Sequence, residues 1–378
     1  MGNRFVPKIL VDIAEFIENP VRTGIQRVVR ELVSRWPSDV EVSFVRFNQS
    51  LNALCVIPRE AIEYAIEIAS NPYGSIEKLS AVIREFLALS PVTPIEIMVG
   101  DRILVPELFI SSSRFIFYRD IQKIGAILYV VLYDIVPWTH PDAMNVVYLG
   151  GFNDYLNVVK RADHRCFDSF AVRDDYYTRI LRAPVQDEFV ASLGADGLGS
   201  VKAVSKRDYL IYPGALDGKK QQDRVFRAFR RSRAYEKYDL VLAGRVPTAP
   251  RKDMLEMLSS ADPRLKIIDN PDDDALRVLI AEARACIFSS RFEGFGLPAI
   301  ESLHLGTPVV VDSGLPAVSG LPTFGQIRLD ADDEDQLVSV LDRLADPLEI
   351  ERLQAEIENL VLPTWDAFAR SIANWVNS

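Results

Sequence analysis

The chain has 378 residues, of which 48% are hydrophobic and 25% charged, a composition typical of a folded globular protein large enough for two domains. Its 43 Lys and Arg residues against 53 Asp and Glu residues give a net charge of −10, so nucleic acid is excluded as the main partner. Three widely spaced cysteines and three histidines without an i,i+4 pair make a disulfide framework and a metal centre unexpected.

Membrane-spanning and exported classes are also disfavoured. The sequence contains no run of about 18 apolar residues, and Met1 to Val11 lacks the apolar stretch of a secretory signal. Unpaired cysteines fit a reducing compartment. We therefore expect a cytoplasmic protein.

Strands and helices alternate along the first half of the sequence. The expected strands are Lys8–Ile13, Val40–Phe47, Arg102–Val105 and Ala126–Leu132, and the expected helices are Ile25–Trp36, Ser75–Leu89 and a segment around Ile121. In the helix Ile25–Trp36 apolar residues recur on one face, while Arg27, Arg30, Glu31 and Arg35 form a polar face. Because parallel strands need a crossover element between them, this order predicts a parallel α/β sheet.

A second series of the same kind follows residues 191–203, which are small and polar as in a linker. Its expected strands are Asp208–Tyr212, Asp239–Ala243, Leu265–Ile268, Ala285–Phe288 and Pro308–Val311, and its expected helices are Gln221–Arg233, Lys252–Ser259, Ala275–Ala285 and Leu297–Leu305. We place the domain boundary after residue 200. In such doubly wound sheets ligands bind at the carboxyl ends of the strands.

The most informative segment, Ser290 to Gly306, directly follows the strand Ala285–Phe288. Glu293 precedes a Gly-Phe-Gly turn, and Glu301 lies one turn into a helix that Pro298 is well placed to start. The amides of the turn and of the helix start can meet an anion, and the two carboxylates can flank it, as a sugar diphosphate would require. The alternative is an ordinary strand-to-helix connection with Glu301 in solvent.

The run E-G-F-G-L-P-x-x-E followed by H-L-G-T-P-V-V resembles the E-x7-E motif of retaining glycosyltransferase family 4. This resemblance implies the GT-B architecture, in which two Rossmann-like doubly wound domains face each other across a cleft. Residues 1–200 would then bind the acceptor, residues 201–360 the nucleotide-sugar donor, and residues 361–378 would form a helix that crosses back to the first domain. The Thr-Gly-Ile-Gln-Arg-Val and Tyr-Asp-Ile-Val-Pro segments look most like bacterial mannosyl- or deoxyhexosyltransferases of polysaccharide or O-antigen assembly.

The resemblance also implies which residues contact the donor. In the second domain these are Gly214, Lys219, Lys220, Gly244, Arg245, Glu293, Phe295, Gly296, Leu297 and Glu301. Lys219 and Lys220 would neutralise the diphosphate, Glu301 would bind the ribose hydroxyls, and Glu293 would face the transferred sugar. Ala215 departs from the family, in which many members have an arginine shortly after the glycine.

In the first domain, the resemblance places Gly24 and Arg27 near the donor phosphates and Asp134 at the acceptor or donor sugar. Tyr133 replaces a familiar histidine. The catalytic residues implied are Glu293, Lys220 and Asp134, acting with no metal and no cofactor, because fixed positive groups would stabilise the leaving diphosphate.

The function indicated is transfer of a hexose or deoxyhexose from a nucleotide diphosphate sugar, with GDP favoured and UDP or dTDP open, to a glycan or lipid-linked glycan. Two alternatives remain open: a sugar-nucleotide epimerase and a non-catalytic sugar-nucleotide or glycan-binding protein. A cluster of arginines is interpreted as a solvated helix face, with a peripheral contact to the inner membrane surface left open. It comprises Arg224, Arg227, Arg230, Arg231 and Arg233.

Overall fold

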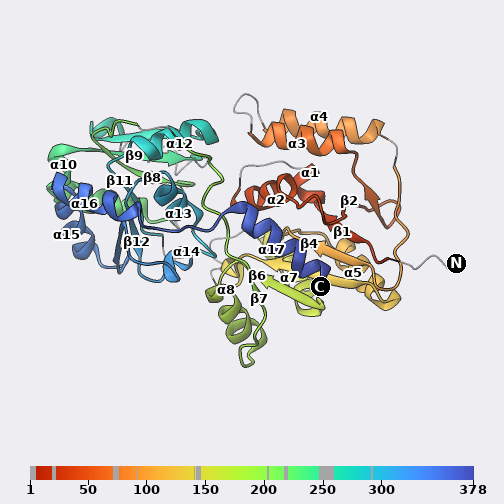
Figure 1. The fold of residues 1–378 in the computed structure, drawn as a ribbon. Coiled ribbons are helices and arrows are strands. Elements are labelled where there is room, and N and C mark those ends of the chain that lie inside the picture. The colour runs from red at the N-terminus through yellow and green to blue at the C-terminus, as the bar shows by residue number, and fades with distance from the viewer. Residues whose placement is uncertain are drawn as a thin grey trace. The chain divides into compact units, whose positions relative to one another are not determined.

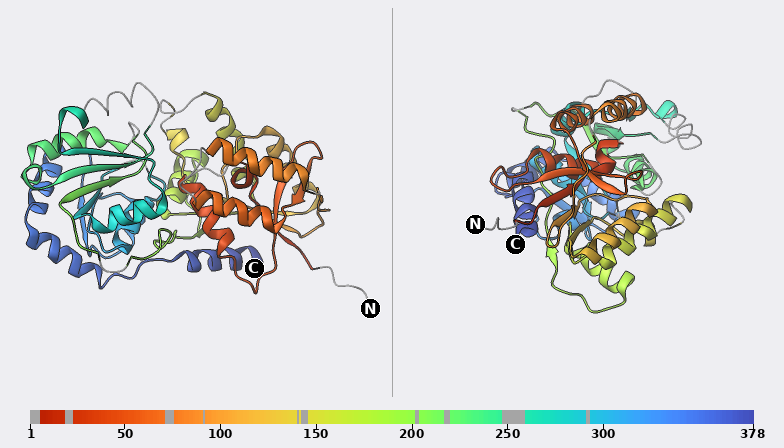
Figure 2. Two further views of the ribbon diagram at one scale, coloured as in Figure 1. Left: turned by 90° about the horizontal axis from the view of Figure 1, so that it is seen from above. Right: turned by 90° about the vertical axis from the view of Figure 1, so that its right-hand side faces the viewer.

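The structure of the protein is a computed structural model that describes residues 6–18, 23–70, 76–90, 92–139, 141, 146–201, 204–216, 220–246, 259–290 and 293–378. The chain divides into two compact units. The first comprises Met1–Leu193 together with Trp365–Ser378, and the second comprises Gly194–Thr364. Each unit contains a single sheet among its described residues, with helices on both sides (Figures 1 and 2).

The sheet of the first unit has seven described strands in the order β3-β2-β1-β4-β5-β6-β7. They are β1 (Ile9–Asp12), β2 (Ser43–Asn48), β3 (Ala53–Val56), β4 (Arg102–Val105), β5 (Ile127–Leu132), β6 (His164–Phe167) and β7 (Phe189–Val190). All neighbouring pairs are parallel except β2 and β3. The strand order reverses between β1 and β4, so the topological switch point of this unit lies between these two strands.

Helices of the first unit connect its strands. They are α1 (Ala14–Glu18), α2 (Gly24–Ser34), α3 (Arg59–Ser70), α4 (Ile76–Leu89), α5 (Ser112–Ile124), α6 (Val136–Thr139), α7 (Val146–Arg161), α8 (Phe170–Asp175) and a π-helical segment, Tyr176–Leu181. The C-terminal α17 (Trp365–Asn377) belongs to this unit and lies next to α2 (Figure 1).

The polar face of α2 differs from expectation, because α17 covers part of it. Arg30 and Glu31 are buried and pair with each other at 3.0 Å. Glu31 also pairs with Arg35, whose guanidinium bonds Asp366 of α17 at 3.1 Å. The polar face of α2 is therefore partly buried, and the Arg35–Asp366 pair joins it to α17.

The sheet of the second unit has six described strands, all parallel, in the order β10-β9-β8-β11-β12-β13. They are β8 (Tyr209–Pro213), β9 (Asp239–Gly244), β10 (Leu265–Asp269), β11 (Ala285–Phe288), β12 (Val309–Asp312) and β13 (Gln326–Leu329). The described helices are α9 (Gln222–Arg231), α10 (Ala234–Lys237), α12 (Asp273–Glu282), α13 (Leu297–His304), α14 (Pro316–Ser319), α15 (Glu334–Leu344) and α16 (Pro347–Ile357). The switch point lies between β8 and β11.

The predicted α/β class with two parallel sheets is confirmed, and several element boundaries shift. The strand expected from Val40 begins at Ser43, and the helix expected to reach Ala285 ends at Glu282. The expected helix Lys252–Ser259 falls almost wholly outside the described residues. The domain boundary was expected after residue 200, whereas the units divide after Leu193.

Candidate functional site

The switch point of the second unit gathers most of the predicted donor residues. The loop after β8 carries Gly214 and Lys220, and the segment after β11 carries Glu293 and leads into α13. Because β8 and β11 are adjacent and parallel, their carboxyl ends open at the same edge of the sheet. Lys220 and Glu293, 73 positions apart in the sequence, therefore meet there. Lys219 lies outside the described residues.

The loops after β8 and β9 approach so closely that glycine is required at the contact. A Cβ at Gly244 would lie 2.0 Å from the carbonyl oxygen of Gly214. Gly214 itself has φ of +123°, and its amide donates to the carbonyl of Ala243 at 2.9 Å. The amide of Leu216 donates to the carbonyl of Arg245 at 3.0 Å. Close backbone approach, which only glycine permits here, fixes the shape of this edge.

Lys220 and Glu293 form an ion pair across the switch point. Their side chains are 19% and 16% exposed, so both are reachable from solvent. The Lys220 ammonium also lies 5.2 Å from the ring centroid of Phe288, the last residue of β11. The hydroxyl of Tyr212 donates to the Lys220 carbonyl, which anchors the backbone at this position. The two predicted catalytic residues of this unit are thus in direct contact.

Helix α13 begins beside this pair with a backbone suited to an anion. Gly296, its N-cap residue, has φ of +105°, and a Cβ there would lie 2.7 Å from Cδ1 of Leu315. Pro298 lies in the first turn as predicted, and the Phe295 carbonyl accepts from the Ala317 amide at 2.9 Å. A glycine cap offers no side chain to the helix start. Pro298 has no N–H and the Ala299 amide donates to the Gly296 carbonyl at 3.1 Å, so an anion from outside the helix would meet the Leu297 amide.

Glu301 and Arg245 occupy contrasting environments in the same unit. Glu301 is 1% exposed on α13, so the alternative that it is a solvated helix residue is wrong. Arg245 follows β9 directly and is exposed. Leu297, the first residue of α13, is 9% exposed.

The residues predicted in the first unit lie apart from one another along its sheet. Gly24 begins α2 after the N-cap Thr23, whose hydroxyl accepts from the Gln26 amide at 3.3 Å. A Cβ at Gly24 would meet no atom of the described residues within 4 Å, so the fold of this unit does not itself require glycine there. Arg27 lies half-buried on the first turn of α2.

Asp134 and Tyr133 follow β5 and make contacts that the sequence left open. Asp134 accepts from the Val136 amide at 2.9 Å and so caps α6. Tyr133 is buried, and its hydroxyl donates to the Pro106 carbonyl at 2.6 Å. Burial, followed by the charge of Asp134, holds the pKa of Asp168 well above its usual range. Because Asp168 follows β6, the carboxylates after β5 and β6 lie at one edge of this sheet.

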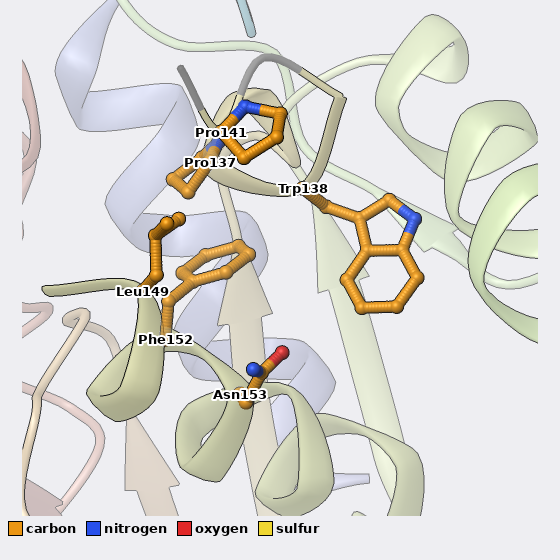
Figure 3. Close-up of a pocket in the computed structure, with 6 residues that line it drawn as sticks. All are labelled: Pro137, Trp138, Pro141, Leu149, Phe152 and Asn153. Carbon is orange, nitrogen blue, oxygen red and sulfur yellow. The ribbon is translucent and has the colours of Figure 1, made fainter. Parts of the chain in front are cut away.

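A small pocket of about 250 Å³ adjoins Asp134 in sequence (Figure 3). It is lined by Pro137 and Trp138 of α6, Pro141, and Leu149, Phe152 and Asn153 of α7. The Trp138 indole is 47% exposed, whereas Phe152 is 1% exposed. In the view of Figure 3, the Phe152 ring lies between Leu149 and Trp138. An exposed indole beside an amide side chain is a surface suited to the apolar face and the hydroxyls of a sugar ring.

Sequence reasoning missed a buried network at the switch point of the first unit, hereafter the β1/β4 network. It consists of Asp12, Glu107, Arg114 and Tyr118, all of them buried. The Arg114 guanidinium lies 3.0 Å from Asp12 and 3.4 Å from Glu107, and the Tyr118 hydroxyl donates to Asp12. A carboxylate at or just after the carboxyl end of a buried strand, as Asp12 in β1 and Glu107 two residues after β4, was the signal available in the sequence.

Glu107 also supplies the anion for the start of α1. Its two carboxylate oxygens accept from the amides of Glu15 at 2.6 Å and Phe16 at 3.0 Å. Burial raises the pKa of Glu107 to about 8, and the charge of Arg114 acts in the opposite direction. Three carboxylates, those of Asp12, Glu15 and Glu107, face one guanidinium here, so the network takes up a proton more readily than exposed carboxylates do.

Comparison with known proteins connects this geometry to an enzyme class. Residues 199–321 match the family model of group 1 glycosyl transferases. The matched span contains both the loop after β8 and all of α13. The chain is 25% identical to the serotype-specific mannosyltransferase WbdA of Escherichia coli over 339 residues, covering 82% of this chain and 38% of WbdA. It therefore spans about two fifths of the length of this relative.

A second relative and a solved structure agree with this match. The O-antigen chain mannosyltransferase RfbU of Salmonella typhimurium is 23% identical over 252 residues, covering 65% of this chain and 68% of RfbU. The crystal structure of Anabaena HepE in complex with UDP and glucose superposes with a TM-score of 0.64, at 15% identity, covering 98% of this chain and 100% of HepE. The predicted GT-B fold and the resemblance to O-antigen mannosyltransferases are confirmed, while membership of family 4 stays a prediction.

The arginine cluster lies on and just after α9, and most of its side chains are exposed, as expected for a solvated face, but they also form ion pairs within their own unit. Four of its members pair with acidic side chains of the described residues: Arg224 with Asp332 at 2.8 Å, Arg227 with Glu334 at 3.2 Å, Arg230 with Asp262 at 3.4 Å, and Arg231 with Glu334 at 2.9 Å. Much of the cluster's charge is therefore compensated locally, and peripheral membrane contact stays a prediction.

Metal binding and membrane insertion concern other expectations from the sequence. Within the described ranges, no group of three or more His, Cys, Asp or Glu side chains could hold a metal ion. In the same part of the chain, no helix is both long and apolar enough to cross a membrane. Metal independence, the absence of a cofactor and a cytoplasmic location stay predictions.

Proposed function

We propose that the protein is a retaining glycosyltransferase that moves a hexose or deoxyhexose, with mannose favoured, from a nucleotide diphosphate sugar to a glycan or lipid-linked glycan. The observation that carries this proposal is the Lys220–Glu293 pair at the start of α13, on the switch point of the second unit. A cation, the start of a helix and a carboxylate are groups suited to a sugar diphosphate. The relatives named as mannosyltransferases support the choice of mannose.

The proposed chemistry assigns one task to each charged group. Breaking the bond between sugar and phosphate develops positive charge on the ring and negative charge on the leaving diphosphate. Lys220 and the first amides of α13 would stabilise the diphosphate as it leaves, without a metal ion. Glu293 would hold a hydroxyl of the transferred sugar, and the acceptor would attack from the face that the diphosphate leaves, which retains the anomeric configuration.

The remaining site residues extend this proposal. Glu301 would bind the ribose, and Gly214, Gly244 and Arg245 would shape the nucleotide side, as the family resemblance implies. Lys219 would act with Lys220 on the diphosphate, and Gly24 and Arg27 would approach the phosphates from the first unit. We favour GDP as the carrier, although the HepE relative was crystallised with UDP and glucose, which supports a nucleoside diphosphate in general.

The acceptor is proposed to bind the first unit beside Asp134. The pocket lined by Trp138 and Asn153 supports this, because it follows Asp134 directly and combines an exposed indole with an amide. Trp138→Ala would then raise the KM for the acceptor and leave the KM for the donor unchanged.

A non-catalytic binding protein is the second candidate. It is favoured by Tyr133, which stands where many members of the family have a histidine and whose hydroxyl donates to the Pro106 carbonyl. Such a protein would bind the donor without turning it over, whether or not an acceptor were present. An epimerase would instead convert the donor in the absence of any acceptor.

The test is a thermal-shift panel of GDP, UDP, dTDP and their sugars on the wild type, on Glu301→Ala and on the control Glu282→Ala. A ligand that binds the folded state alone stabilises it, by about 2.7 kcal/mol at one hundred times its Kd. We expect one nucleotide to shift the wild type and the control but not Glu301→Ala. No shift by any nucleotide would overturn the proposal. Product analysis by NMR then decides between retention and inversion.

A further inference from the structure

The Lys220–Glu293 pair implies that the site carries its own counter-ion before any ligand arrives. A lysine held against a carboxylate presents little net positive charge to an incoming diphosphate, because the carboxylate repels the same anion that the ammonium attracts. Both side chains are partly exposed, at 19% and 16%, so the pair can open by side-chain rotation alone. An anion that binds Lys220 must first displace Glu293.

We infer that Glu293 acts as a displaceable counter-ion of Lys220 that makes the site prefer a sugar-bearing donor over the free nucleoside diphosphate. This inference rests on the proposed function and concerns the specificity of that site. A nucleotide sugar brings hydroxyl donors, which can satisfy the Glu293 carboxylate after it leaves Lys220. A free nucleoside diphosphate brings only more negative charge, and so leaves that carboxylate unpaired beside an anion.

The surroundings of Lys220 allow such an exchange without a change in the backbone. The Lys220 carbonyl accepts from the Tyr212 hydroxyl, and the next residue, Gln221, has φ of +56° as the N-cap of α9. The Phe288 ring lies 5.2 Å from the ammonium and offers a second, weaker attraction to the positive charge. Lys220 thus stays in place when Glu293 turns away, and its ammonium is then free for a phosphate oxygen.

The preference has a consequence for turnover. A transferase releases a nucleoside diphosphate after each reaction, and that product competes with the next donor. Return of Glu293 to Lys220 would expel the product, because the carboxylate and the phosphate compete for the same ammonium. The pair would therefore act both in selecting the donor and in releasing the product.

The experiment compares the binding of GDP and GDP-mannose to the wild type and to Glu293→Gln by calorimetry. Glutamine keeps the size of the side chain and removes its charge. We expect Glu293→Gln to bind GDP about tenfold more tightly, because the Lys220 ammonium no longer has to leave a carboxylate before it binds a phosphate, and to bind GDP-mannose no more tightly than the wild type does. Equal or weaker binding of GDP by Glu293→Gln would overturn the inference.

A double variant separates an effect through Lys220 from direct repulsion of the phosphates. In a Lys220→Gln background there is no ammonium to release, so Glu293→Gln should leave the affinity for GDP almost unchanged. A full tenfold gain in that background would show that Glu293 does not act through Lys220, and would also overturn the inference. Glu293→Asp keeps the charge and should leave the affinity for GDP close to that of the wild type.

The matched control is Glu282→Gln, which removes the same charge in the same unit. Glu282 pairs with Arg207 at 3.4 Å, at the amino-terminal ends of β8 and β11, the edge opposite to the site. Its affinity for GDP should equal that of the wild type, and a gain as large as that of Glu293→Gln would mean that overall charge is responsible. If the wild type binds none of GDP, UDP and dTDP, with or without a sugar, the proposed function itself fails. If the wild type binds nucleotide and Glu293→Gln has no higher affinity for GDP, only the inference is contradicted.

Discussion

The carboxyl ends of β1 and β4 in the first unit and of β8 and β11 in the second occupy the same place in the same kind of sheet, but different side chains fill them. In the first unit, the β1/β4 network closes the switch point with buried charges that satisfy one another. In the second unit, Lys220 and Glu293 remain partly exposed beside the glycine-capped start of α13. Both edges offer helix amides to an anion.

The difference lies in where that anion comes from. Helix α1 receives the carboxylate of Glu107 from its own chain, through the amides of Glu15 and Phe16. Helix α13 begins with Gly296, which has no side chain to offer. A switch point can therefore bind an external anion only where no side chain of the protein already occupies the start of the helix. The topology of the sheet alone does not distinguish an occupied helix start from an unoccupied one.

The largest expected effect comes from breaking the β1/β4 network. Arg114→Met leaves Asp12 and Glu107 buried without their cation, which should lower the free energy of unfolding of the first unit by about 3–5 kcal/mol. All four tryptophans, Trp36, Trp138, Trp365 and Trp375, lie in the first unit, so tryptophan fluorescence during urea unfolding reports on it.

The control for Arg114→Met is Arg119→Met on the same helix α5. Arg119 is 39% exposed and pairs with Asp120 at the surface, so its loss should cost less than about 1 kcal/mol. Equal destabilisation by both substitutions would mean that the network has no special role in holding the unit together. Nucleotide binding by the second unit should survive wherever the protein stays folded.

Lys220→Met, at the switch point of the second unit, should lower activity strongly and change stability little. The rate of sugar transfer should fall by about 10²–10³-fold, the usual cost of removing one group that stabilises a developing negative charge. Stability should change little, because both members of the pair have access to water. Lys266→Met, which removes an exposed lysine from β10, should keep full activity. Loss of activity in both variants would indicate a general effect of charge.

Local sequence patterns were sufficient to predict the segment from β11 to α13. The apolar run of β11, the glycine turn and Pro298 each determine structure within a few residues, and the strand, turn and helix all stand close to where they were expected. The contact between Lys220 and Glu293 was not predictable in this way. It joins residues 73 positions apart, and it depends on β8 and β11 being neighbours in the sheet.

Other features were missed because their sequence signals are weak. The strand β6, His164–Phe167, has only two apolar residues, Cys166 and Phe167, at its end. The burial of Arg30 and Glu31 on α2 depends on α17, more than 300 positions later in the chain. The β1/β4 network consists of charged residues, which sequence patterns assign to the surface by default. Long-range packing decides each of these cases.

Gly244→Ala tests whether the shape of the candidate site depends on the close contact between the backbones of Gly214 and Gly244. The new methyl would lie 2.0 Å from the Gly214 carbonyl oxygen, so the loops after β8 and β9 must move apart at a cost of about 1–3 kcal/mol. Hydrogen exchange of the β8 and β9 amides should accelerate, and nucleotide affinity should fall. Gly320→Ala is the control, because a Cβ there meets no atom within 4 Å and its φ is −92°. Equal behaviour of both variants would contradict the steric argument.

The smallest expected effect is a dependence of stability on pH to which Glu107 of the β1/β4 network contributes. Burial raises the pKa of Glu107 from 4.5 to about 8. The folded state then binds more protons than the unfolded state between these values, so the free energy of unfolding of the first unit should fall as pH rises through this range. The slope should be at most about 1.4 kcal/mol per pH unit, and less because Asp12 and Arg114 respond together.

Glu107→Gln cannot titrate and should flatten that slope, measured by urea unfolding with tryptophan fluorescence at pH 5.5, 6.5 and 7.5. The exposed Glu63, which pairs with Arg59 on α3, provides the control, because Glu63→Gln should leave the slope unchanged. A slope that persists in Glu107→Gln would assign the proton to another group of the first unit. Nucleotide binding at Lys220 and Glu293 should not follow this slope. The β1/β4 network lies in the other unit, and of the two switch points only that one holds more buried carboxylates than cations.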